Sequence, residues 1–255
     1  MKLTFLGTAT STGIPQIGCG CPVCTSADPR DNRLRCSSRV EYHGHNFLID
    51  CGPDFRTQIL REGSPDIDTL LITHIHYDHV GGIDDLRPFC YRHNGLPIYC
   101  TGDVAKGLRH NFPYCFVKHP YPGVPSFHIN EISRDEPFFV DGIEITPLPV
   151  MHYMLPIVGY RIGNLAYITD AKTIPDKTIS LMKNVDTLVV NSLRIEEHIA
   201  HLSLRESLEV VDKVKPRVAY FIHMSHDMGR HADVEPTLPD GVHLAFDSLS
   251  IDLPD

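Results

Sequence analysis

The segment 73–79 reads Thr-His-Ile-His-Tyr-Asp-His and places three imidazoles and a carboxylate close together. His74 and His76 are two residues apart, so in extended backbone their rings point to the same side. Asp78 and His79 precede a Gly-Gly pair that opens a helix, and they can reach a second point nearby. Groups this dense are costly to bury without partners, and together they suit zinc, manganese or iron.

Three further candidate ligands stand singly at the ends of predicted apolar strands: His152, Asp170 and His223. Any one of them alone would be interpreted as a structural residue. Downstream of the dense motif, the three together favour a second set of ligands. A carboxylate at position 170 could bridge two cations through its two oxygens, which an imidazole cannot do. These residues predict a two-metal hydrolase centre.

Short apolar runs bounded by turn signals must position these residues. We predict strands over residues 2–6, 39–42, 46–50, 69–73, 97–100, 138–140, 143–148, 158–162, 166–169, 186–191, 218–222 and 243–246. Ser203 and Glu206 form a capping-box pattern at the start of a helix over 203–214. Weaker helix patterns cover 81–89 and 177–184. Hairpins with interspersed helices indicate two sheets packed face to face under outer helices.

The composition excludes several functional classes. A formal net charge of −9 gives no general attraction to nucleic acid or to an acidic membrane surface. No apolar run is long enough to span a membrane, and the N-terminus lacks the pattern of a signal peptide, so we expect a cytoplasmic protein. We therefore expect five scattered cysteines to be buried thiols and not disulfides. They are Cys36, Cys51, Cys90, Cys100 and Cys115.

We interpret residues 1–255 as one domain. Two segments within it depart from the regular pattern of strands and helices. Residues 112–137 are rich in proline and aromatic residues, and they form either a surface connection or an arm over the site or a partner. A loop at 18–36 opens with Cys19, Cys21 and Cys24. Three thiolates this close suit a tetrahedral zinc, and His226 could supply the fourth ligand.

The order His74-x-His76-x-Asp78-His79, followed by lone His, Asp and His residues, resembles the metallo-β-lactamase superfamily. The resemblance implies an α/β fold with a four-layered αββα sandwich. It implies that one metal is held by His74, His76 and His152. The other would be held by Asp78, His79 and His223, with Asp170 and a hydroxide bridging the two metals.

Closer features are similar to the PhnP-like cyclic phosphodiesterases of that superfamily. His201 in Ala-His-Leu-Ser-Leu looks like the extra histidine of the phosphodiesterase and ribonuclease Z branch. Cys19, Cys21, Cys24 and His226 match that family's structural zinc ligands. The chain departs from the family in residues 112–137, and in Ser248, where relatives often have glycine.

The resemblance implies a hydrolase that cleaves phosphodiester bonds in a small substrate, either a cyclic phosphate or a short nucleotide. His201 would stabilise phosphoryl oxygens or protonate the leaving group, Asp78 would steady the attacking water, and His198 would line the pocket. We expect two catalytic zinc, manganese or iron ions and one structural zinc. We expect no long nucleic acid and no membrane partner, and a homodimer contact remains open. The alternatives are an ester, thioester or lactam hydrolase and a non-catalytic metal-binding accessory protein.

Overall fold

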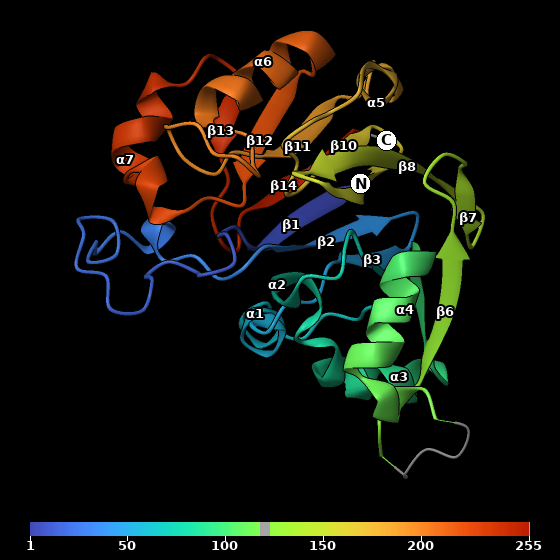
Figure 1. Cartoon of the computed structure of the whole chain (residues 1–255). Helices are drawn as coiled ribbons and strands as arrows, with labels where there is room; N and C mark the ends of the chain where they lie inside the picture. Colours follow the sequence, from blue (N-terminus) through green and yellow to red (C-terminus); the bar gives the residue numbers. More distant parts are fainter. Residues whose placement is uncertain (118–122, 255) are drawn as a thin grey trace.

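The computed structural model describes residues 1–117 and 123–254. They form two seven-stranded sheets stacked face to face, with helices on both outer sides (Figure 1). The two chain ends lie close together (Figure 1), and Met1 N donates to the Leu253 carbonyl. The architecture confirms the predicted αββα sandwich.

The first sheet has the strand order β14-β1-β2-β3-β4-β5-β6. Its strands are β1 Lys2–Gly7, β2 Ser37–Tyr42, β3 His45–Ile49, β4 Thr69–Leu71, β5 Leu96–Thr101, β6 Phe127–Ile132 and β14 Ser250–Asp252. From β14 to β3 the neighbours are antiparallel, and from β3 to β6 they are parallel. The sheet is therefore mixed, whereas the sequence pattern suggested mainly antiparallel hairpins.

The second sheet has the strand order β13-β12-β11-β10-β9-β8-β7. Its strands are β7 Phe138–Val140, β8 Ile143–His152, β9 Leu155–Ile162, β10 Leu165–Tyr167, β11 Thr187–Asn191, β12 Val218–Ile222 and β13 Val242–Leu244. Strands β7 to β10 are antiparallel, and β10 to β13 are parallel. Parallel strands bring their carboxyl ends to one edge, which is where side chains can gather into a site.

The α-helices cover the two outer faces (Figure 1). Those on the first sheet are α1 Phe55–Arg61, α2 Tyr77–Val80, α3 Arg87–His93 and α4 Gly102–Asn111, and those on the second are α5 Asp176–Leu181, α6 Leu204–Val214 and α7 His231–Val234. Short 3₁₀ turns span Pro29–Asp31, Ile83–Leu86, Pro113–Cys115, His226–Met228 and Glu235–Thr237. None of the helices in the described residues is long and apolar enough to cross a membrane.

Three apolar layers separate the four layers of secondary structure. The middle layer joins the sheets, with Phe5 and Phe47 from the first facing Tyr160 and Tyr167 from the second, all fully buried. One outer layer packs the first sheet against α1 to α4, and the other packs the second sheet against α5 to α7. Burying apolar surface on both faces of each sheet stabilises this arrangement.

Turn and cap chemistry account for several elements. His43 and Gly44 have φ of 49° and 78°, so a two-residue turn joins β2 to β3. Asp141-Gly142 likewise joins β7 to β8, as predicted. At the start of α6, the Ser203 side chain accepts from the Glu206 backbone N–H while the Glu206 carboxylate accepts from the Ser203 backbone N–H. The predicted capping box is confirmed.

Two local predictions were wrong. Residues 81–89 are not one helix, because a 3₁₀ turn over Ile83–Leu86 precedes α3, which begins at Arg87. Residues 112–137, interpreted as either a surface connection or an arm, are not irregular throughout, because β6 within them forms the edge of the first sheet beside β5. Residues 118–122 of that segment lie outside the described part of the chain. The five scattered cysteines are free and buried, as predicted.

Candidate metal centre

The predicted ligands lie together at one edge of the sandwich, after the carboxyl ends of strands. His74, His76, Asp78 and His79 follow β4, His152 ends β8, Asp170 follows β10, and His223 follows β12 directly. Asp170 and His223 have φ of 55° and 58°, and Asp50 after β3 has φ of 61°. Left-handed backbone is uncommon for residues other than glycine and concentrates at functional sites. These turns aim three strand-end side chains into one space.

One group of nitrogens comes from His74, His76 and His152. His74 Nε2 lies 3.1 Å from His76 Nδ1, and the ring of His152 is centred 5.1 Å from that of His76. His152 Nδ1 lies 2.9 Å from the Ala200 carbonyl and donates to it, which leaves Nε2 to face the group. The three histidines can therefore hold one cation.

A second group consists of Asp78, His79, Asp170 and His223, all buried. His79 Nε2 lies 3.3 Å from both Asp78 Oδ2 and Asp170 Oδ1, and His223 Nε2 lies 3.1 Å from Asp170 Oδ1. The other oxygen of Asp170, Oδ2, lies 3.8 Å from His74 Nε2 in the first group. Asp170 thus turns one oxygen toward each group, which is the arrangement that a bridging carboxylate needs.

The donor set fits divalent cations. Zinc–nitrogen and zinc–oxygen bonds of about 2.0–2.2 Å place tetrahedral ligands about 3.3–3.6 Å apart. The nitrogen–oxygen separations in the second group are 3.1–3.6 Å. His79 Nε2 and His223 Nε2 are buried without a hydrogen-bond partner among the described residues. Such buried nitrogens are costly unless another group, here a cation, satisfies them.

The electrostatics of the group lead to the same conclusion. Burial disfavours the ionised form of Asp170, yet His223 and His79 outweigh burial and hold the pKa of Asp170 well below its usual range. Burial likewise opposes the charge on His79, but Asp170, Asp50 and Asp78 raise the pKa of His79 well above its usual value. Binding a cation would displace the proton from His79 and supply the positive charge that these carboxylates need.

Asp50 is a site residue that the sequence interpretation missed. Its carboxylate accepts from His79 Nδ1 at 2.7 Å, from the Thr73 backbone N–H at 2.8 Å and from the Thr73 hydroxyl at 2.8 Å. The bond from Nδ1 turns His79 Nε2 toward the cluster. The available signal was an aspartate at a strand end, the same position that identified Asp170, but we treated Asp50 only as the last residue of its strand.

Backbone contacts also fasten the Asp50 segment to the metal motif. Cys51 N–H donates to the His79 carbonyl at 2.7 Å, and Gly82 N–H donates to the Cys51 carbonyl at 2.9 Å. A Cβ on Gly52 would lie 2.0 Å from the Asp78 carbonyl oxygen, so only glycine allows this approach. The short helix α2, which carries Asp78 and His79, is therefore held against the end of β3.

We expect Asp50→Asn to reduce metal affinity and turnover by about 10- to 100-fold, because an amide cannot accept from all three donors. Chelator competition and steady-state kinetics would measure the two effects. Asp54→Asn is a matched control, because Asp54 pairs with Arg35 at 2.9 Å and contacts no histidine of the cluster. Unchanged metal affinity in Asp50→Asn would show that His79 does not need this partner.

His201 lies beside the shared carboxylate. Its Nδ1 is 3.9 Å from Asp170 Oδ2, and its ring is centred 4.5 Å from that of His152 and 5.0 Å from that of His223. Burial, together with His223, lowers the pKa of His201 to about 3. The ring is thus adjacent to both metal groups. His198 lies farther out, with its ring centred 5.3 Å from that of His201 and its Nδ1 accepting from the Ala200 N–H.

The cysteine loop meets His226 away from this cluster. His226 Nδ1 lies 3.2, 3.4 and 3.5 Å from the sulfurs of Cys19, Cys21 and Cys24. Zinc–sulfur and zinc–nitrogen bonds of about 2.3 and 2.0 Å place tetrahedral ligands about 3.5 Å apart. The Cys24 backbone N–H, assisted by Cys19 and His226, lowers the pKa of the Cys21 thiol to about 6, which favours the thiolate that binds metal. The four residues fit a zinc ion.

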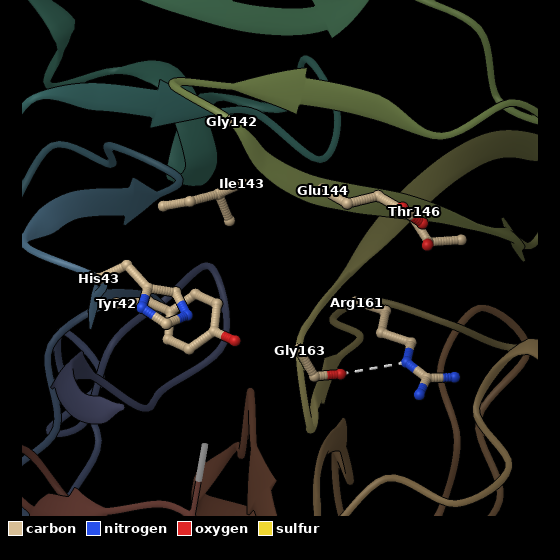
Figure 2. Close-up of a pocket in the computed structure, with 8 residues that line it drawn as sticks. All are labelled: Tyr42, His43, Gly142, Ile143, Glu144, Thr146, Arg161 and Gly163. Carbon is tan, nitrogen blue, oxygen red and sulfur yellow. Dashed lines mark hydrogen bonds between the residues drawn. The ribbon is translucent and has the colours of Figure 1, made fainter.

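A cavity of about 510 Å³ lies elsewhere, between the turns of the two sheets, and contains none of these ligands. Figure 2 shows Tyr42 and His43 on one side of it and Arg161 on the other, with Arg161 directed toward the Gly163 carbonyl. Arg161 also donates to the Leu181 carbonyl at 2.7 Å. Its guanidinium therefore serves the fold, and the chemistry of the chain lies at the histidine cluster.

Comparisons with known proteins agree with this placement. Residues 45–224 match the Beta-lactamase superfamily domain. The crystal structure of a new diphosphatase from the PhnP family is 38% identical, with a TM-score of 0.92 over 99% of this chain and 98% of that one. An octanoyltransferase of Porphyromonas gingivalis is 39% identical over 98% of this chain but only 51% of its own length.

A ribonuclease Z of Methanococcus maripaludis is 30% identical over 63% of this chain and 48% of its own length. The chain thus spans about half the length of these two curated relatives.

Proposed function

The chain belongs to the β-lactamase superfamily and to the PhnP family within it, and on that premise we propose that it is a metal-dependent hydrolase of phosphodiester bonds. One observation carries the proposal: Asp170 directs its two oxygens toward two separate groups of ligands, with His201 beside it. The substrate would be small, such as a cyclic phosphate or a short nucleotide, because the net charge of −9 disfavours a long polyanion.

His74, His76 and His152 would hold one cation, and Asp78, His79 and His223 would hold the other, with Asp170 shared. Two cations in these positions would lower the pKa of a water molecule and would neutralise charge on phosphoryl oxygens. Zinc suits this donor set, and so do manganese and iron.

The chain's own residues would orient the reactants. Asp78 Oδ2, 3.3 Å from His79 Nε2, can accept a hydrogen bond from the attacking water and direct it at phosphorus. His201 lies beside Asp170, where its ring, neutral because its pKa is lowered to about 3, can donate a hydrogen bond to a phosphoryl oxygen. The names of two relatives, a diphosphatase and a ribonuclease Z, support cleavage at phosphorus.

We expect His201→Ala to lower kcat by about 10²- to 10³-fold while both catalytic metals remain bound, because the ring acts on the substrate and not on the metals. Steady-state kinetics and metal analysis of the same preparation measure this. His198→Ala is the matched control, with a smaller expected effect because its ring lies outside that of His201. Loss of a metal in His201→Ala would instead identify His201 as a ligand, which its proximity to His152 and Asp170 also allows.

A second candidate function is hydrolysis of an acyl thioester or ester. The name of the 39% identical relative, an octanoyltransferase, favours it, although that name describes a protein of about twice this length. A bis-aryl phosphodiester, an aryl phosphomonoester, an octanoyl thioester and a lactam should therefore be tested on one metal-analysed preparation. Preferential turnover of the diester supports the proposal, and preferential turnover of the thioester would replace it with the acyl hydrolase.

A further inference from the structure

The first ligand group opens to solvent on one side. His74 is buried, whereas His152 is partly buried and His76 is exposed. Their rings are centred 5.1 Å apart. Because the second ligand group is buried throughout, a substrate must approach past His76 and His152.

Large apolar side chains stand next to these two histidines in the chain. Tyr77 follows His76 and is 69% exposed, while Tyr153 and Met154 follow His152 and are 54% and 75% exposed. Ile199, between His198 and Ala200, is 67% exposed. We call Tyr77, Tyr153, Met154 and Ile199 the apolar rim. Exposed apolar groups gathered at one place on a surface mark a binding site more often than isolated ones do.

The rim is held by ordered backbone. Tyr153 and Met154 form the two-residue turn between β8 and β9, because His152 pairs with Leu155. The hydrogen bond from His152 Nδ1 to the Ala200 carbonyl brings Ile199 to the same place. The Tyr77 ring lies against Gly81, where an added Cβ would come within 2.7 Å of it. Such preorganised apolar groups bind a ligand with little ordering cost.

Two cations near His198 are already engaged. Burial, together with the charges of Arg194 and Lys172, lowers the pKa of His198. Arg194 donates to the Glu197 carbonyl at 2.8 Å, and Lys172 pairs with Glu206 at 2.6 Å. These two cations are therefore not free to bind a second phosphate group.

We propose that the apolar rim binds an aromatic or apolar non-leaving ester group on the substrate phosphorus, and so selects diesters whose non-leaving group is aromatic or apolar over diesters whose non-leaving group is a small alkyl. This inference rests on the proposed phosphodiester hydrolysis. Tyrosine and methionine side chains suit it, because aromatic rings stack on planar groups and sulfur packs well against ring edges.

The test compares two esters with the same leaving group, bis-p-nitrophenyl phosphate and methyl p-nitrophenyl phosphate. The difference in intrinsic reactivity between the two esters is the same whichever variant is assayed. A change in the ratio of their kcat/KM values therefore reports on the rim. We expect Tyr153→Asn, alone and combined with Ile199→Ser, to lower the preference for the aryl ester about tenfold. Asparagine tolerates the φ of 52° at this turn, so the fold should be preserved.

Tyr91→Ala is the matched control, because Tyr91 is 61% exposed on α3 and donates to the Gly123 carbonyl, away from the ligands. A reduced aryl preference in the rim variants, with normal metal content, supports the proposal. An unchanged preference overturns it while leaving phosphodiester hydrolysis intact. If the fully metallated native protein cleaves neither ester, the proposed function fails, and the rim proposal fails with it.

Discussion

Asp170→Asn is expected to lose catalytic metal and to lower diester turnover on the order of 10³-fold or more. The native carboxylate turns Oδ1 toward His79 and His223 and Oδ2 toward His74, so it is the residue that both ligand groups share. An amide offers one neutral oxygen and an N–H pair that would point at a cation or a histidine nitrogen. Metal analysis and steady-state kinetics on one preparation would measure both losses.

The cysteine cluster provides an internal control for this experiment. A chain with two catalytic metals and one structural zinc should lose metal only at the catalytic pair, because Cys19, Cys21, Cys24 and His226 do not contact Asp170. Circular dichroism would show whether the sandwich is preserved. If Asp170→Asn keeps both catalytic metals and turns over diester within tenfold of the native rate, the bridging role is wrong.

Cys21→Ser should abolish zinc binding at the cysteine cluster and lower the free energy of unfolding by about 3 kcal/mol or more. For a chain of this size, that loss corresponds to a fall in Tm of about 6–12 °C. The site joins segments that are distant in the sequence, since His226 comes 202 residues after Cys24. Without the metal, the packing around the cysteines is a small apolar cluster of Ala9, Ile14 and Val23, with Cys21 and Cys24 packed against it.

Activity should decline after stability, because the segment that leads into this loop supports the strand end that carries His223. Met224 N–H donates to the Thr8 carbonyl, and Thr10 N–H donates to the Met224 carbonyl. Cys115→Ser is the matched control, a buried thiol outside the cluster that should leave zinc content unchanged. Native zinc content and an unchanged Tm in Cys21→Ser would contradict the structural role.

The fold could be predicted because the apolar pattern is strong where strands are buried on both faces. Thr187–Asn191 is buried throughout, and the sequence pattern places it with only a one-residue difference at its start. Edge elements carry a weaker signal. Strand β6 alternates partly buried Phe127 and Ile129 with exposed His128 and Asn130, so it resembled a polar connection. Helices α1 and α4 were missed as well, because few apolar positions mark them.

The candidate ligands could be predicted because their spacing and their positions at strand ends are properties of the local sequence. The structure then brings them together. Asp50 was missed because it acts on His79 through a hydrogen bond between distant segments. The apolar rim was missed for a related reason. An exposed tyrosine carries no signal in the sequence until the structure shows that His76 and His152 lie on the open side of the histidine cluster. Such roles depend on contacts between residues that are distant in the sequence, and not on the secondary-structure propensity of the residue itself.

The measurement that tests the central claim most directly is hydrolysis of bis-p-nitrophenyl phosphate by metal-analysed protein. It should be made before chelation, after chelation, and after return of zinc or manganese. The two-metal centre predicts turnover that disappears when the catalytic pair is removed and returns when the metal is restored, with the structural zinc retained throughout. No diester turnover by protein that holds both catalytic metals would contradict the proposed function.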